Sequence, residues 1–190
     1  MARELAGASV SSAAELLGVS SAELARELDA AFRDNPIRAM PGATTVVRAL
    51  DGRIPMAVAT NGPARLVHYG LTEIGLADAF AAVVSADQVP HPKPAPDVYI
   101  AACLALNVDP SDAIAIEDSP AGARAASETG MIVVGVSSSA PATIRADLRV
   151  PRLDDPIVFR YLGVDPPRPR QAHLVRRPSA AADVRGPGTA

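Results

Sequence analysis

Short apolar segments alternate with helical segments through the middle of the chain, and this alternation limits the fold more than any other feature. The segments that we predict as strands are residues 54–59, 82–85, 113–116 and 132–136. The helices predicted between them are residues 63–75, 95–106 and 120–129. Continuously apolar strands separated by helices are typical of a parallel sheet covered on both faces. The sequence therefore predicts an α/β fold, a Rossmann-like parallel sheet sandwiched by helices.

The segment before this alternation is helical. Residues 11–18 and 20–32 have helical spacing, and Ser20 with Glu23 matches a capping box at the start of the second helix. A further helix is expected within residues 41–50. Residues 165–190 are rich in proline and arginine with few large apolar side chains, so we expect a disordered tail, with a basic interaction arm as the alternative.

The composition excludes several classes of function. A net charge of -3 over 190 residues offers no basic field for nucleic acid, so we expect no nucleic-acid partner. No stretch approaches the roughly 20 apolar residues that span a bilayer, and we expect no membrane contact. Cys103 is the single cysteine. A lone cysteine in an apolar helix fits a small buried side chain in a reducing compartment, which favours the cytoplasm.

Lys93 is the only lysine in the sequence. Of the 18 lysine and arginine residues, all the others are arginines. Prolines at positions 90, 92, 94 and 96 surround it and stiffen its backbone. A compact ammonium held in one place differs from a planar guanidinium in what it can bind. Lys93 is therefore the first candidate for a functional side chain, although an exposed loop is the usual setting for a lysine.

Two strand ends flank this lysine in the sequence. Thr60 and Asn61 end one strand and lead into a helix whose first amide groups favour an anion, so they could hold a phosphoryl group. The alternative is that Asn61 only caps that helix. Glu117 and Asp118 end another strand, where hard oxygen ligands suit Mg²⁺, or else complement the next helix dipole. Two acids need a further ligand to make a magnesium site.

These segments, in order, resemble motifs of the haloacid dehalogenase superfamily. Thr60-Asn61 resembles its second motif, Lys93-Pro94-Ala95-Pro96-Asp97 its third, and Glu117-Asp118-Ser119-Pro120-Ala121-Gly122 its fourth. The resemblance covers roughly residues 38–137. It is strongest to the branch of phosphatases and phosphomutases with a helical cap, such as beta-phosphoglucomutases and phosphoglycolate phosphatases.

The resemblance implies roles for the matching residues. Thr60 and Lys93 would be catalytic, phosphate would lie against Thr60, Asn61 and Lys93, and Glu117 with Asp118 would hold the Mg²⁺ cofactor. The substrate would be a small phosphorylated metabolite. It also implies a partial helical cap over residues 1–38 and a core over residues 39–164.

The first motif of that family is absent. In that family it is a central strand ending in two aspartates one residue apart, which supply the nucleophile, the general acid and base, and another magnesium ligand. This sequence contains no Asp-x-Asp pair, and no segment in residues 1–10 reads as a buried strand. We therefore expect an unfilled slot between the strands at 54–59 and 113–116, which another segment or a partner would have to fill.

Three hypotheses follow. The chain is a member, or a truncated product, of a magnesium-dependent phosphatase or phosphomutase family, with negligible turnover as written because the nucleophile is missing. Alternatively, it is a non-catalytic module that binds phosphate or acts in an interaction. A misassigned start codon is the third explanation for the missing motif.

Overall fold

The computed structural model describes residues 9–35, 37–137 and 144–166. Its α-helices are α2 (Val10–Leu17), α3 (Ser21–Asp34), α4 (Ala43–Leu50), α5 (Ala64–Glu73), α6 (Asp97–Leu106), α7 (Pro120–Glu128) and α8 (Pro156–Tyr161). Its strands are β1 (Ala57–Thr60), β2 (Ala82–Ser85), β3 (Ile114–Glu117), β4 (Ile132–Val136) and β5 (Leu148–Val150). Short 3-10 helices are η1 (Ala77–Ala79), η2 (Ala86–Gln88) and η3 (Pro110–Asp112).

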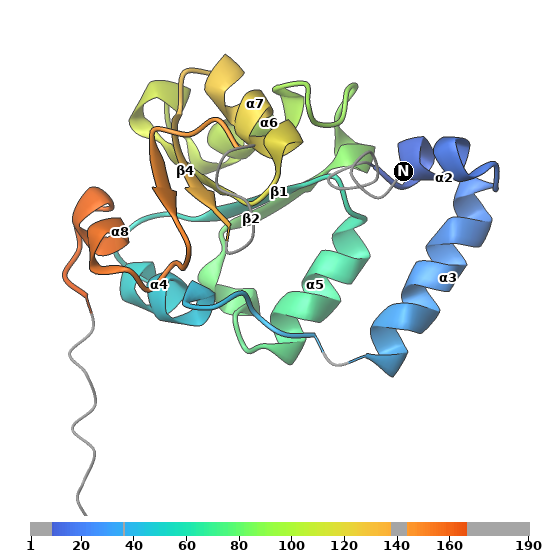
Figure 1. Ribbon diagram of the computed structural model, residues 1–190, viewed down its shortest axis with the longest axis horizontal. Helices are drawn as coiled ribbons and strands as arrows, with labels where there is room; N and C mark the ends of the chain where they lie inside the picture. The colour runs from blue at the N-terminus through green and yellow to red at the C-terminus, as the bar shows by residue number, and fades with distance from the viewer. Residues whose placement is uncertain (1–8, 36, 138–143, 167–190) are drawn as a thin grey trace, which may run out of the picture.

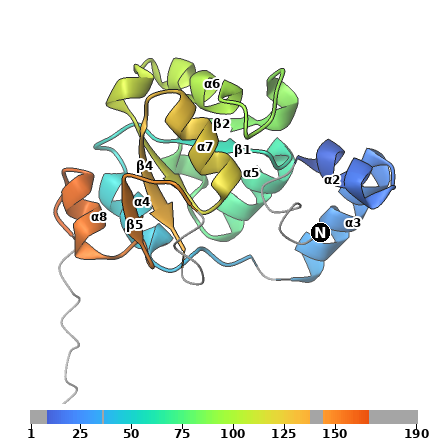
Figure 2. The same cartoon turned by 45° about the horizontal axis from the view of Figure 1, so that its top comes forward.

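All strand pairs are parallel, and helices cover both faces, which confirms the α/β prediction (Figure 1). Neighbouring residues of β4 show the two faces, since side chains alternate along a strand. Val133 packs with residues of α6 and α7, whereas Val134 packs with residues of α4 and α8. Figure 2 shows α6 and α7 together on one side of the strands and α4 with α8 on the other.

The strands form two sheets rather than one. β1 pairs with β2, and β3, β4 and β5 form a second sheet in that order. Within the described chain no ladder joins β1 to β3, so each has one edge without a neighbouring strand. This is the division that the sequence predicted between residues 54–59 and 113–116.

Exposure agrees with the open edges. Every residue of β1 is only half-buried, and Ile116 of β3 is 37% exposed although the strand is apolar. The prediction of a strand over residues 54–59 that is buried on both faces was therefore wrong in extent and in burial. The strand is four residues long, and without a neighbour on one side it cannot be covered as a central strand is.

Other predicted elements fall within a few residues of the observed ones, and one strand, one α-helix and the short 3-10 helices were missed. β5 has three residues, one of them Arg149, so it carries no apolar run. α8 has six residues and begins after Asp155, whose side chain accepts a hydrogen bond from the Ile157 amide. Ser20 caps α3 by accepting from the Glu23 amide at 3.1 Å, as the sequence indicated.

The cap and tail boundaries stay predictions. α2 and α3 lie together at one end of the molecule, and an Asp29–Arg65 ion pair links α3 to α5 (Figure 1). The predicted tail lies outside the described residues except for positions 165 and 166, and so does most of the segment 1–10. Among the residues described, no helix is both long and apolar enough to cross a membrane.

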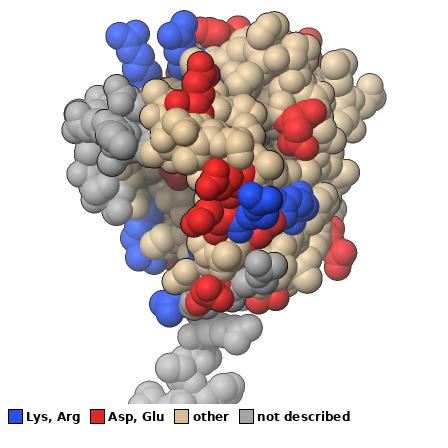
Figure 3. Space-filling model, turned by 90° about the vertical axis from the view of Figure 1, so that its right-hand side faces the viewer, with Lys and Arg blue, Asp and Glu red and all other residues tan. Residues whose placement is uncertain are grey.

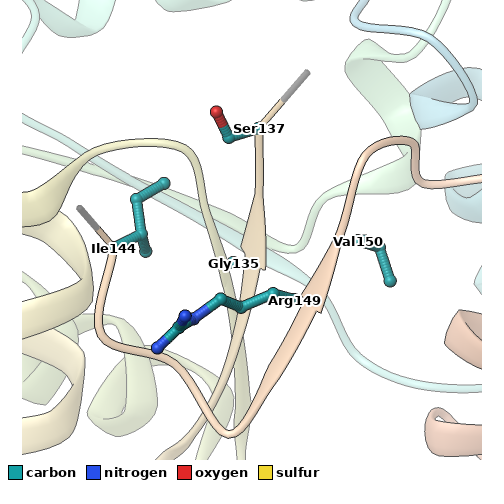
Figure 4. Close-up of a pocket in the computed structure, with 5 residues that line it drawn as sticks. All are labelled: Gly135, Ser137, Ile144, Arg149 and Val150. Carbon is teal, nitrogen blue, oxygen red and sulfur yellow. The ribbon is translucent and has the colours of Figure 1, made fainter. Parts of the chain in front are cut away.

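Gly135 allows a returning segment to cross closely over β4. A Cβ at this position would lie 3.0 Å from Ile144 Cγ2 and 3.0 Å from Ala146 Cβ. Figure 4 shows a small hollow with Ile144 on one side of β4 and Val150 of β5 on the other, and in this view the Arg149 side chain extends from β5 toward Ile144. The crossing brings Ile144 into the core under α6 and α7.

The close contact between Gly42, before α4, and the backbone at Asp154 can be tested by substitution. Its φ is +87°, and a Cβ there would meet the Asp154 amide nitrogen at 2.2 Å. We expect Gly42→Ala to lower the free energy of unfolding by more than about 2 kcal/mol, because backbone strain and a clash with main chain add together.

Gly52→Ala is the matched control, since Gly52 has a φ of +67° with no atom within 4 Å. In urea denaturation, Gly52→Ala should lose less free energy of unfolding than Gly42→Ala, because it adds backbone strain without a clash. Equal losses in the two variants would contradict the close approach at Gly42.

Candidate functional site

The Lys93 ammonium lies where the carboxyl ends of β1 and β3 meet. Only 7% of its side chain is exposed. It donates to the main-chain oxygen of Ala59 in β1 at 3.0 Å, and it forms an ion pair with Glu117 at the end of β3. The sequence placed Lys93 in a loop between these strands, and the structure shows that it connects them.

Asn61 fixes the loop that carries this lysine. Its Nδ2 donates to the Lys93 carbonyl at 3.0 Å, and its Oδ1 accepts from the Lys93 amide at 2.8 Å. α5 instead begins after Pro63, and no side chain caps it. The alternative in which Asn61 caps this helix was therefore wrong. Its assignment to phosphate binding stays a prediction.

Thr60 is held in a tight turn at the end of β1. Its Oγ1 accepts a hydrogen bond from the Gly62 amide at 2.9 Å. A hydroxyl can also donate, and Thr60 donates to no residue that the structure describes. The half-buried hydroxyl is thus able to donate a hydrogen bond to an anion at this end of the sheet.

Glu117 is buried, with 7% of the residue exposed, and both carboxylate oxygens accept hydrogen bonds. Oε1 accepts from Lys93 and Tyr99, and Oε2 accepts from the Ser119 hydroxyl at 3.0 Å. The carboxylate packs against the first turn of α7, where a Cβ on Gly122 would lie 2.0 Å from Oε2. Gly122 is therefore needed for Glu117 to occupy this place.

Tyr99 is a member of the site that sequence reasoning missed. It comes from α6, donates its hydroxyl proton to Glu117, and accepts from Lys93 Nζ at 3.2 Å. Burial, together with the charges of Glu117 and Asp118, raises the pKa of Tyr99 far above its usual value, so the hydroxyl stays protonated. A tyrosine six residues after Lys93, among apolar side chains of a helix, was the available signal.

Asp118 is exposed and has no hydrogen bond or ion pair with any residue that the structure describes. The two adjacent acids therefore differ, because neighbours on a strand end point to opposite sides. Asp118 fits one ligand position of a Mg²⁺ site, whereas Glu117 is occupied by protein donors. Across the described segments no group of three or more His, Cys, Asp or Glu side chains could hold a metal. These residues alone do not complete a magnesium site.

Two hollows of the described structure lie away from these residues. The hollow of Figure 4 lies at β4 and β5, and a groove along α7 is lined by Arg124 and Arg145 among others. Neither is lined by Thr60, Lys93 or Asp118. On the face drawn in Figure 3, acidic and basic side chains are interspersed among other residues, so this face has no continuous basic field.

Comparison with known proteins identifies the family. Residues 4–130 match the family described as haloacid dehalogenase-like hydrolases. The chain belongs to this family.

Two relatives with known functions come from bacteria. The chain is 38% identical over 118 residues to validoxylamine A 7'-phosphate phosphatase of Streptomyces hygroscopicus subsp. limoneus, covering 58% of this chain and 55% of that protein. It is 37% identical over 116 residues to fructose-1-phosphate phosphatase YqaB of Escherichia coli, covering 60% of this chain and 61% of that protein. The chain thus matches less than two thirds of either relative.

A solved structure supports the fold. The beta-phosphoglucomutase from Clostridium difficile superposes with a TM-score of 0.71 at 22% identity, over 85% of this chain and 78% of that one. At this identity the likeness concerns the fold. A third relative, the beta-phosphoglucomutase of Bacillus subtilis, is 38% identical over 85 residues, covering 45% of this chain and 37% of that protein. With the two phosphatases above, it confirms the resemblance to the phosphatase and phosphomutase branch of the haloacid dehalogenase-like hydrolases.

The buried ion pair can be tested by its effect on stability. We expect Lys93→Met to lower the free energy of unfolding by about 3–5 kcal/mol, because it leaves the Glu117 carboxylate buried without its cation. The double variant Lys93→Met, Glu117→Leu should lose less than the sum of the single variants, since no charge remains buried.

Arg124→Met is the control, because the Arg124–Glu128 pair is exposed (70% and 42%). It should change the free energy of unfolding by less than about 1 kcal/mol in the same urea titration. Additive losses for Lys93 and Glu117 would show that the two charges do not interact.

Proposed function

We propose that this chain forms the phosphate-binding part of a magnesium-dependent phosphatase or phosphomutase that acts on a small phosphorylated metabolite. The observation that carries the proposal is the position of Lys93, a buried cation at the converging ends of β1 and β3, in a member of a hydrolase family. Ligands of open α/β sheets bind beyond the carboxyl ends of the strands. The names of two relatives, phosphatases of sugar-like phosphates, support the substrate class.

In this proposal, each of three residues has its own role in binding the anion: Thr60, Asn61 and Lys93. The Thr60 hydroxyl donates to a phosphoryl oxygen, and the Lys93 ammonium supplies positive charge in a largely dry setting where it acts strongly. Asn61 acts by fixing the backbone of Lys93, so that the ammonium is held before the anion arrives. Preorganised charge of this kind is the main source of catalysis in phosphoryl transfer.

Catalysis requires a group that the described site does not supply. Among the described residues, the carboxylate in contact with Lys93 is that of Glu117, which is engaged by its protein donors, and we assign Asp118 to the metal rather than to attack on a phosphoryl group. We propose that a further parallel strand between β1 and β3, from another segment or a partner chain, supplies the nucleophile and closes both open edges. With that strand in place, a carboxylate at its end would lie near Lys93.

The dependence on Mg²⁺ is part of the proposal. Asp118 is the residue of this chain that offers a carboxylate to the ion, and further oxygen ligands would come from the added strand and the phosphate. The ion would neutralise phosphate charge in the bound complex. We place the protein in the cytoplasm, because a buried Cys103 without a disulfide suits a reducing compartment.

A second candidate function is a phosphate-binding module without catalysis. It is favoured by the sequence, which keeps Thr60 and Lys93 but contains no Asp-x-Asp pair. Hydrolysis of p-nitrophenyl phosphate, measured for the pure chain and again with a completing strand supplied, separates the two. The proposal expects no turnover from this chain alone and magnesium-dependent turnover once the completing strand is supplied, whereas the module expects none in either case.

Phosphate binding itself is tested with Thr60→Val. Phosphate should raise the melting temperature of the wild type, because a ligand that binds only the folded state stabilises it. Thr60→Val should bind phosphate about tenfold more weakly, the effect of one hydrogen bond to a charged group.

Thr45→Val in α4 is the control, with the same change at a half-buried threonine outside the site, and should bind as the wild type does. Calorimetric titration gives the dissociation constants. Unchanged phosphate affinity in Thr60→Val would remove this hydroxyl from the site.

A further inference from the structure

The Lys93 ammonium is saturated by the protein. An ammonium has three N–H donors and no acceptor. Within the described structure they are directed at Ala59 O, at the Tyr99 hydroxyl and at Glu117 Oε1. A phosphoryl oxygen that binds Lys93 directly must therefore replace one of these acceptors.

The three acceptors differ in how readily they can be given up. Separating Lys93 from Glu117 would leave two buried charges unpaired, which is the most costly choice. Releasing Ala59 would leave a main-chain oxygen at the end of β1 without this donor. The Tyr99 hydroxyl is neutral, and at 3.2 Å it is the farther of the two acceptors without a formal charge. Hydrogen bonds to neutral acceptors are the weaker ones.

Tyr99 also retains its other interactions after such an exchange. Its hydroxyl proton is donated to Glu117, so the hydroxyl stays anchored when Lys93 turns away. Its ring lies 4.7 Å from Lys93 Nζ, close enough to attract the cation through its face. Loss of one N–H contact therefore leaves the ammonium near its original place.

We propose that the Tyr99 hydroxyl takes the place of an anion oxygen. It accepts a hydrogen bond from the third N–H of Lys93 before an anion binds, and this hydrogen bond breaks when a phosphoryl oxygen binds Lys93 instead. Tyr99 is thus a positioning residue that sets the affinity of Lys93 for anions. This inference rests on the proposed function, since it requires an anion to bind at Lys93.

The test is Tyr99→Phe, which removes the hydroxyl and keeps the ring. In the empty variant one buried N–H of Lys93 lacks its acceptor, so an incoming anion no longer competes for that proton. We expect Tyr99→Phe to bind inorganic phosphate about threefold to tenfold more tightly than the wild type, and to melt at a lower temperature without phosphate. A residue that only supported the fold would weaken binding when removed.

Tyr161→Phe is the matched control, because Tyr161 is 40% exposed on α8 and lies outside the site. Binding is followed on the side-chain ammonium of Lys93 by nitrogen NMR with labelled lysine, which gives a single signal because the chain has one lysine. This signal also reports whether phosphate reaches Lys93 at all.

The outcomes separate the inference from the proposed function. A phosphate-dependent shift of the Lys93 signal with tighter binding in Tyr99→Phe supports both. The same shift with equal or weaker binding in Tyr99→Phe overturns the role of Tyr99 and leaves phosphate binding intact. A Lys93 signal that phosphate does not move in any variant overturns the proposed function, and the inference with it.

A second measurement covers the case in which Tyr99→Phe does not fold. The chain has three tyrosines and no tryptophan. In the double variant Tyr69→Phe, Tyr161→Phe, both at positions that are 40% exposed, Tyr99 is the sole tyrosine, and its emission can be excited apart from that of phenylalanine. Phosphate should change its emission as the Lys93 contact is released. Unchanged emission at a phosphate concentration that shifts the Lys93 signal would overturn the inference.

Discussion

The ion pair between Lys93 and Glu117 is the interaction on which the arrangement of this protein depends. It connects the ends of two sheets that share no backbone ladder within the described residues, because Lys93 contacts Ala59 in β1 and Glu117 is the last residue of β3. Removing both charges from water is costly, and the pair is stable only because further groups complete its hydrogen bonds. Tyr99, Ser119 and the Ala59 carbonyl supply them. The residues that connect the two sheets are therefore the same residues that we propose for the functional site.

The same pair decides what its neighbours can do. Since Glu117 is turned into the protein and held by Lys93, the next residue, Asp118, points to solvent with its carboxylate available. An acidic dipeptide thus yields one buried counterion, Glu117, and one exposed carboxylate, Asp118. Gly122 makes this division possible, because any side chain there would occupy the volume of the Glu117 carboxylate.

The sequence predicted the order of the elements well, since β2 and β4 are apolar runs whose ends are marked by turn residues. It predicted the division of the sheet from a missing motif. It could not predict that Glu117 and Asp118 would separate, or that Tyr99 would join Lys93, because both depend on how α6 and α7 pack against the strand ends. β5 was missed because three residues carry too little pattern to be distinguished from a loop.

The open edges and the saturated lysine have a common physical origin. Where a neighbouring strand is absent, backbone and charged groups near the gap must find partners inside the chain, because buried polar groups without partners are costly. Lys93 meets this requirement with Glu117, Ala59 and Tyr99. A strand that enters beside β1 and ends in a carboxylate would offer Lys93 a new partner of the same charge as Glu117. Under the proposed function, that carboxylate and Glu117 would therefore lie near the same ammonium, and the charge of Lys93 would be shared between them.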